Sequence, residues 1–128
     1  MRLDHVGIAT DDLDGLTAVF EGLFGATLAH EETLDGLSVA FLEAGGPDLE
    51  LLEPLGDTGT VARFIDRRGP GLHHLAFEVA EVAAALEDAG RLGLEAVDDE
   101  PRPGARGHTV AFLHPGSTGG VLVEFVEH

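Results

Sequence analysis

The chain is organised around Leu72-His73-His74-Leu75-Ala76-Phe77-Glu78-Val79, because a second segment near its start follows the same pattern. That segment is Leu3-Asp4-His5-Val6-Gly7-Ile8-Ala9-Thr10, and the two align when His5 is placed on His74. Both surround the histidine with small and apolar residues, and both lead into a helix-like stretch. Self-similarity of this kind indicates a duplicated structural unit.

The repeat extends beyond the two histidines. Val39-Ala40-Phe41-Leu42 recurs as Val110-Ala111-Phe112-Leu113, and Leu49-Glu50-Leu51-Leu52-Glu53 recurs in kind as Val123-Glu124-Phe125-Val126-Glu127. The spacing between the copies grows along the chain, as insertions in loops would produce. The duplication therefore places His5 on His74 and Glu50 on Glu124.

Hydrophobic periodicity predicts the same order of elements in both copies, namely a strand, a helix and three strands. In the first module we expect strands at residues 2–10, 26–33, 37–43 and 49–53, with a helix that ends near residue 24. In the second we expect strands at 72–79, 94–98, 108–114 and 121–127 and a helix at 81–92, with a short helix at 60–68 between the modules. This is an α+β fold in a single domain, residues 1–128, with module one at about 1–54, a linker at 55–70 and module two at about 71–128.

Composition excludes several classes of protein. The chain has no cysteine, which excludes disulfides, thiolate zinc sites and thiol nucleophiles and suits a reducing cytoplasm. Its 24 acidic residues outnumber 7 basic residues, all arginine, and the net charge of -17 argues against a nucleic-acid partner. No stretch approaches the roughly 20 apolar residues that a membrane span needs. We expect a cytoplasmic protein that is not in a membrane, and we interpret its acidic surface as that of a halophile's enzyme.

Two histidines and two glutamates at equivalent positions could form one metal site. If the modules pack about a local two-fold axis, the four side chains face one point: His5, Glu50, His74 and Glu124. Two imidazoles and two carboxylates suit a divalent transition metal such as cobalt, manganese, nickel, zinc or iron. Taken singly, a histidine in a strand is more often a structural polar group, and either glutamate alone would be read as an outward-facing residue of an alternating strand. His73 points to the opposite face from His74, because side chains alternate along a strand.

Six segments carry a resemblance to a known family: LDHVGIA at 3–9, VAFLEAG at 39–45, LELLEPLG at 49–56, GLHHLAFEV at 71–79, DEPRPGA at 99–105 and VAFLHPGSTGGVLVE at 110–124. They cover nearly the whole chain and resemble the methylmalonyl-CoA epimerase family of the vicinal oxygen chelate superfamily, which also contains glyoxalases, bleomycin resistance proteins and dioxygenases. The resemblance implies two tandem βαβββ modules that form a cupped eight-stranded mixed sheet around a central metal. It also implies metal ligands at His5, Glu50, His74 and Glu124, although some members have Gln at the position of Glu50.

The activity that the resemblance implies is interconversion of (R)- and (S)-methylmalonyl-CoA, by metal-assisted removal and return of the proton on the carbon next to the thioester. It implies Glu124 as a catalytic acid–base residue, with Glu50 as the other candidate. Some members carry a Glu on the third strand where this chain has Val39. The implied cofactor is a divalent metal ion, Co²⁺ first, with Mn²⁺, Ni²⁺ and Zn²⁺ as alternatives. Family members are commonly homodimers and act in propionyl-CoA metabolism.

An acyl-CoA substrate carries phosphates, and an acidic protein must attract them locally. Five of the arginines lie in two short stretches, Arg63, Arg67 and Arg68 in the linker and Arg102 and Arg106 in the Gly/Pro-rich loop. They are candidates for binding CoA, although surface arginines also serve in ion pairs.

Other functions remain open at this stage. A glyoxalase I-like lyase would use the same metal site. A ring-cleaving dioxygenase would bind iron through two histidines and one carboxylate, whereas this chain offers two carboxylates. A metal-free protein of the same fold would only bind a small molecule. Four further histidines have no partner at a ligand spacing in the sequence, and we expect no role for them: His30, His108, His114 and His128.

Overall fold

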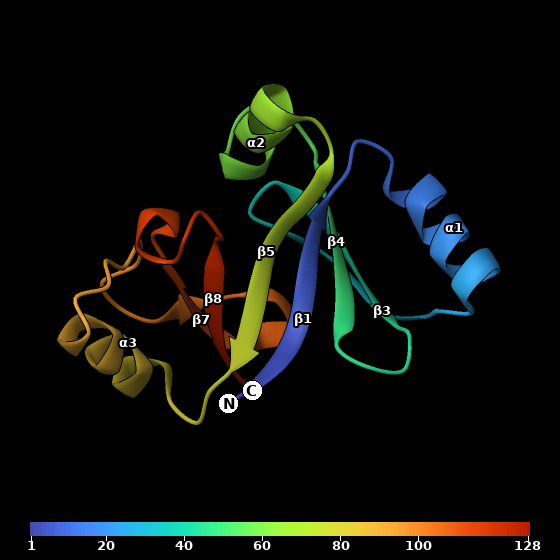
Figure 1. The fold of residues 1–128 in the computed structure, drawn as a ribbon. Coiled ribbons are helices and arrows are strands. Elements are labelled where there is room, and N and C mark those ends of the chain that lie inside the picture. Colours follow the sequence, from blue (N-terminus) through green and yellow to red (C-terminus); the bar gives the residue numbers. More distant parts are fainter. The chain divides into compact units, whose positions relative to one another are not determined.

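The structure is a computed structural model that describes all 128 residues. It contains eight strands, three α-helices and two short 3-10 helices (Figure 1). In chain order they are β1 (Arg2–Ala9), α1 (Leu13–Phe24), β2 (Thr27–Leu34), β3 (Leu37–Glu43), β4 (Asp48–Pro54), α2 (Thr60–Arg68), β5 (Gly71–Glu78), α3 (Val82–Arg91), β6 (Arg102–Pro103), η1 (Ala105–Gly107), β7 (Thr109–Leu113), η2 (Pro115–Ser117) and β8 (Val123–Glu127). The order of strand, helix and three strands occurs twice, so the predicted α+β class and tandem modules are confirmed.

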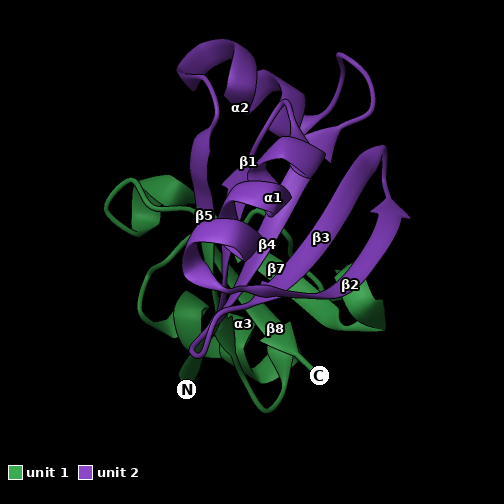
Figure 2. Ribbon diagram, turned by 90° about the vertical axis from the view of Figure 1, so that its right-hand side faces the viewer, with its two compact units in different colours: residues 1–4, 74–128 green, residues 5–73 purple.

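The chain divides into two compact units, coloured separately in Figure 2. We call residues 5–73 the N-terminal unit, and residues 1–4 together with 74–128 the C-terminal unit. None of the helices combines the length and the apolar character that crossing a membrane requires.

The N-terminal unit has its strands in the order β2-β3-β4-β1, with β4 and β1 parallel and the other pairs antiparallel. Helix α1 packs its apolar side on one face of these strands, around buried Leu13, Ala40 and Leu51. The helix begins after Asp12, whose carboxylate accepts from Gly15 N–H at 3.0 Å, and it ends at Gly25, which has a φ of 67°. The opposite face of the strands is left for the polar side chains described below.

The C-terminal unit repeats this plan with strands in the order β5-β8-β7-β6, of which β5 and β8 are parallel. Helix α3 buries Val82 and Ala85 against Ala111 and Phe125. The two modules also share an equivalent hydrogen bond, which a glutamate makes at the start of each helix. Glu53 Oε1 accepts from Leu13 N–H at 2.6 Å at the start of α1, and Glu127 Oε1 accepts from Val82 N–H at 2.9 Å at the start of α3.

The predicted strand at 94–98 is wrong. This segment makes only an isolated bridge between Ala96 and Leu113, and the strand next to β7 is the two-residue β6. Its backbone still bonds to that of Phe112 and His114, because Val97 N–H donates to Phe112 O at 2.8 Å and His114 N–H donates to Glu95 O at 2.7 Å. Side chains supply the other bonds, since Glu95 N–H donates to Ser117 Oγ at 2.8 Å and the Asp98 carboxylate accepts from Phe112 N–H at 2.9 Å. A side chain thus takes the place of a strand's carbonyl, and the regular ladder is interrupted.

Candidate functional site

The first half of the candidate site lies in the N-terminal unit and pairs His5 on β1 with Glu50 on β4. Their Nε2 and Oε1 atoms are 3.3 Å apart, and both side chains are buried, with 4% and 6% of the residue exposed. Phe41 on β3 lies directly opposite Glu50 in the β3–β4 register. The rings of His5 and Phe41 meet edge to face, with their centroids 5.5 Å apart and their planes at 85°. The phenyl ring therefore limits how the imidazole can turn.

The second half lies in the C-terminal unit and repeats this arrangement with His74 on β5 and Glu124 on β8. Their Nε2 and Oε1 atoms are 3.4 Å apart, and 5% and 7% of these residues are exposed. Phe112 on β7 lies opposite Glu124, and its ring meets that of His74 at 5.5 Å and 86°. Each module thus presents a buried histidine, a buried glutamate and an aromatic ring in the same geometry.

Burial separates these four side chains from every other ionisable group. His5, Glu50, His74 and Glu124 are the only Asp, Glu, His or Arg residues of the chain that are buried. Removing a carboxylate from water is unfavourable by several kcal/mol unless it is paired or binds a metal. Because burying these four side chains is unfavourable, their presence in the interior indicates a functional role.

The donor set fits a divalent metal ion. Two ligand atoms that each lie about 2.1 Å from the same ion are roughly 3.0 to 3.4 Å apart when the ligand–metal–ligand angle is between about 90° and 109°. The nitrogen-to-oxygen distances of 3.3 Å and 3.4 Å in the two pairs match this separation. Each couple therefore has a donor geometry that fits a divalent metal ion.

A family model for the Glyoxalase/Bleomycin resistance protein/Dioxygenase superfamily matches residues 4–112. The chain belongs to this superfamily. Within it, the chain is 38% identical over 126 residues to the mitochondrial methylmalonyl-CoA epimerase of Homo sapiens, which spans 96% of this chain and 72% of that protein. These two comparisons confirm the resemblance to the superfamily and, within it, to methylmalonyl-CoA epimerases.

Solved structures of the superfamily agree with this assignment. Methylmalonyl-CoA epimerase from Mycobacterium tuberculosis superposes with a TM-score of 0.94 at 37% identity, covering 98% of this chain and 87% of that one. A variant of the Streptomyces coelicolor methylmalonyl-CoA epimerase, solved in complex with 2-nitronate-propionyl-CoA, has a TM-score of 0.94 at 36% identity and covers 99% and 96%. Both comparisons extend over nearly the whole chain.

His73, the neighbour of the candidate ligand His74, contacts a helix. Its ring meets that of Phe64 on α2 edge to face, with centroids 4.9 Å apart. The guanidinium of Arg68 lies over the same phenyl ring, 5.5 Å from its centroid. His73 therefore takes part in an aromatic and cationic stack on α2.

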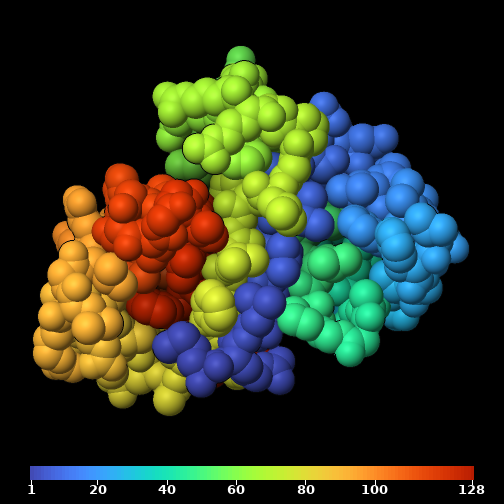
Figure 3. Space-filling view, in the orientation of Figure 1, coloured from blue at the N-terminus to red at the C-terminus, as the bar shows by residue number.

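The arginines predicted to bind CoA occupy two different settings. Arg63, Arg67 and Arg68 are exposed on α2, which lies at the surface in Figure 3. Arg102 donates through Nε to Asp98 at 3.0 Å, and its guanidinium lies 5.5 Å from the centroid of Phe112, the ring that contacts His74. Only one phenyl ring thus separates this cation from a candidate ligand.

Among the histidines for which the sequence offers no partner at a ligand spacing, His30 contacts a carboxylate. On β2, His30 Nε2 lies 3.0 Å from Glu32 Oε1. The spacing of two residues places both side chains on the same face of a regular strand, so a signal was present in the sequence.

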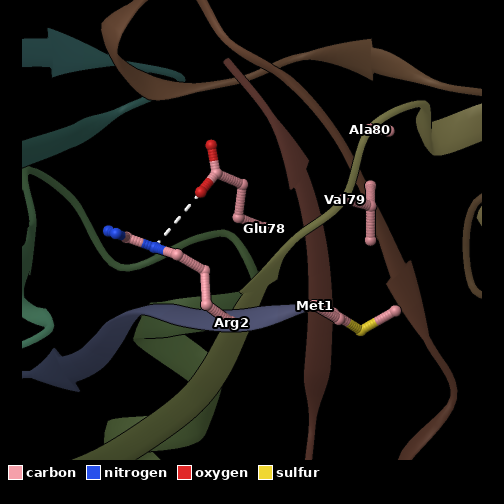
Figure 4. Close-up of a pocket in the computed structure, with 5 residues that line it drawn as sticks. All are labelled: Met1, Arg2, Glu78, Val79 and Ala80. Carbon is pink, nitrogen blue, oxygen red and sulfur yellow. Dashed lines mark ion pairs between the residues drawn. The ribbon is translucent and has the colours of Figure 1, made fainter.

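His128 also contacts carboxylates. Its Nε2 lies 2.7 Å from Asp4 Oδ1, its Nδ1 lies 3.4 Å from Glu78 Oε2, and its ring stacks on His108. Figure 4 shows Arg2 and Glu78 pointing toward one another across a small surface pocket, with Nε and Oε1 3.2 Å apart. This cluster is an ion-pair network at the surface of the C-terminal unit, because cationic or titratable groups already engage its carboxylates.

Proposed function

We propose that this protein is a methylmalonyl-CoA epimerase that interconverts the (R) and (S) epimers of its acyl-CoA substrate. Relatives of that name match over nearly the full chain, and one of them binds an acyl-CoA analogue, 2-nitronate-propionyl-CoA. The observation that carries the proposal is the pair of equivalent, buried His–Glu couples that this chain has at His5 with Glu50 and at His74 with Glu124.

We infer that the two halves act as one domain and that these four side chains bind a single divalent metal ion. Co²⁺ is the first candidate, and Mn²⁺, Ni²⁺ and Zn²⁺ suit the same mixture of nitrogen and oxygen ligands. When bound, the cation would supply Lewis-acid stabilisation of the negative charge that develops on the thioester oxygen during proton removal.

The residues of the chain have distinct tasks in this reaction. Glu124 is the first candidate to hold and return the α-proton, and Glu50 is the second, because both carboxylates are buried beside an imidazole. Phe41 and Phe112 restrict the histidine rings through edge-to-face contacts. Substrate binding also needs cations for the CoA phosphates, which we assign to exposed Arg63 and to its neighbours on α2.

Solvent exchange tests the proposal directly. With metal-loaded protein in D₂O, we expect deuterium to enter the second carbon of the methylmalonyl group and the two epimers to equilibrate. A chelator should abolish both effects, and re-addition of Co²⁺ should restore them. Absence of exchange from the metal-loaded protein would overturn the proposed activity.

Two further measurements separate the alternatives. Elemental analysis of purified protein distinguishes a metal enzyme from a metal-free binding protein, and turnover of a glutathione hemithioacetal would favour a glyoxalase I-like lyase. Light scattering would test the homodimer that is common among family members.

A further inference from the structure

Strand β2 contains a bulge that changes which of its side chains face the candidate site. Leu28 pairs with Leu42 of β3, but the next pairing is His30 with Phe41, so Ala29 is an extra residue. Leu28 packs with Leu42 in the core beneath α1. Directly opposed residues share a face, and neighbouring residues alternate, so His30 must lie on the other face with Phe41. Bulges commonly redirect side chains in this way next to active sites.

That other face is the one that carries the first half of the candidate site. The ring of Phe41 contacts both histidines, with centroids 5.5 Å from His5 and 6.2 Å from His30. The strand registers place His30 opposite Phe41 and Phe41 opposite Glu50, so these three residues form one row across β2, β3 and β4. The bulge thus brings a third polar side chain, that of His30, into line with His5 and Glu50.

Glu32 follows on the same face, one row further along. It lies opposite the buried Val39 of β3. Its Oε1 is 3.0 Å from His30 Nε2, and the side chains of Glu32 and His30 are 24% and 37% exposed. A half-exposed, hydrogen-bonded pair can exchange protons with solvent, which the buried couples can do less readily.

The separation of the strands suits a bound substrate. Neighbouring strands lie about 4.8 Å apart, so β2 and β4 are roughly 10 Å from each other. A small acyl group over β3 would have Glu50 on one side and Glu32 on the other. Inversion at a carbon atom needs two proton-transfer groups, one for each side of the planar intermediate.

We propose that Glu32 is the second proton-transfer group of the epimerisation and that His30 is its positioning residue. This inference rests on the proposed function. In one direction the Glu32 carboxylate takes the α-proton, and the electron pair of the C–H bond passes into the enolate. A second, protonated carboxyl group, for which Glu124 is the first candidate and Glu50, across β3 from Glu32, is the second, then gives its proton to the α-carbon, and the enolate's electron pair forms the new C–H bond. Exchange of protons with solvent restores both carboxyl groups.

The test uses single epimers in D₂O with the full-length, metal-loaded protein. For Glu32→Gln we expect epimerisation to fall by about 100-fold or more, the range for loss of a general acid–base group. Deuterium exchange without inversion should persist for the one epimer whose proton the other group removes. The matched control is Glu31→Gln, because Glu31 is exposed and lies opposite Ala40, on the face toward α1, and it should stay within about twofold of the unaltered protein.

His30→Gln provides a second, independent test. It should lower kcat by about 10-fold with little change in KM and shift the pH profile of kcat, while the metal content stays stoichiometric. The inference is overturned if Glu32→Gln epimerises at the rate of the unaltered protein, or if it loses exchange of both epimers equally while keeping its metal. An unaltered protein with no exchange at all would instead overturn the proposed function.

Discussion

His74 Nε2 lies 3.4 Å from Glu124 Oε1, and the equivalent pair in the other module, His5 and Glu50, is separated by 3.3 Å. Duplication has thus preserved a buried polar contact as closely as it has preserved the order of strands. A packing role alone does not explain this, since an apolar pair of similar volume would be as stable or more stable in the same place.

Replacing His74 by Ala should abolish metal binding, because it removes one imidazole from the proposed ligand set. His73→Ala is the control, since the ring of His73 packs on Phe64 of α2. Elemental analysis after extensive dialysis should find stoichiometric metal in the control and less than a tenth of that in His74→Ala. Equal metal contents in the two variants would remove His74 from the site.

The two glutamates should differ when each is changed to Gln. Glu50→Gln keeps an oxygen that can bind metal, so we expect it to retain the metal and to keep exchange within about 10-fold. Glu124→Gln should lose exchange of the epimer whose proton Glu124 removes by about 100-fold or more, because an amide cannot accept the α-proton. Rates of deuterium uptake, normalised to metal content, measure the difference. If Glu50→Gln loses more activity than Glu124→Gln, the assigned roles are reversed.

The sequence predicts the repeat, and with it most of the fold and the four residues that the structure shows as two His–Glu couples. Two features escape it for local physical reasons. The segment at 94–98 has apolar residues like a strand, but side chains interrupt its pairing with β7, because Ser117 Oγ accepts from Glu95 N–H and the Asp98 carboxylate accepts from Phe112 N–H. On β2, a regular strand would place Leu28 and His30 on one face, and only the register shift between them shows that they lie on opposite faces. Bulges leave little trace in a pattern of polar and apolar residues.

Phe41 should affect metal affinity without binding metal. Phe41→Leu frees the ring of His5, and loss of such support lowers metal affinity by about 10-fold or more. The substitution also leaves a small cavity and should lower the free energy of unfolding by about 1–2 kcal/mol. Phe20→Leu is the control, because Phe20 packs in the core beneath α1. Competition titrations with a chromogenic chelator should show weaker binding only for Phe41→Leu.

The equivalent glutamates at the starts of α1 and α3 should contribute equally to stability. Glu53→Ala and Glu127→Ala each leave a helix N-terminal N–H without its carboxylate, and each should lower the free energy of unfolding by about 1–2 kcal/mol. The two changes share no partner, so their effects should add in the double variant. Glu43→Ala, at an exposed position, should change stability by less than about 0.5 kcal/mol. Urea denaturation monitored by circular dichroism measures all four variants.

Salt should stabilise the protein strongly. Its net charge of -17 gives repulsion among surface carboxylates that no lysine relieves. The screening length shortens from about 30 Å at 0.01 M salt to about 3 Å at 1 M, so molar KCl removes most of this repulsion. We expect the melting temperature to rise by at least about 10 °C between these conditions, more than in sucrose of equal osmolality. A melting temperature that does not change with salt would contradict the interpretation of the acidic surface as a halophilic adaptation.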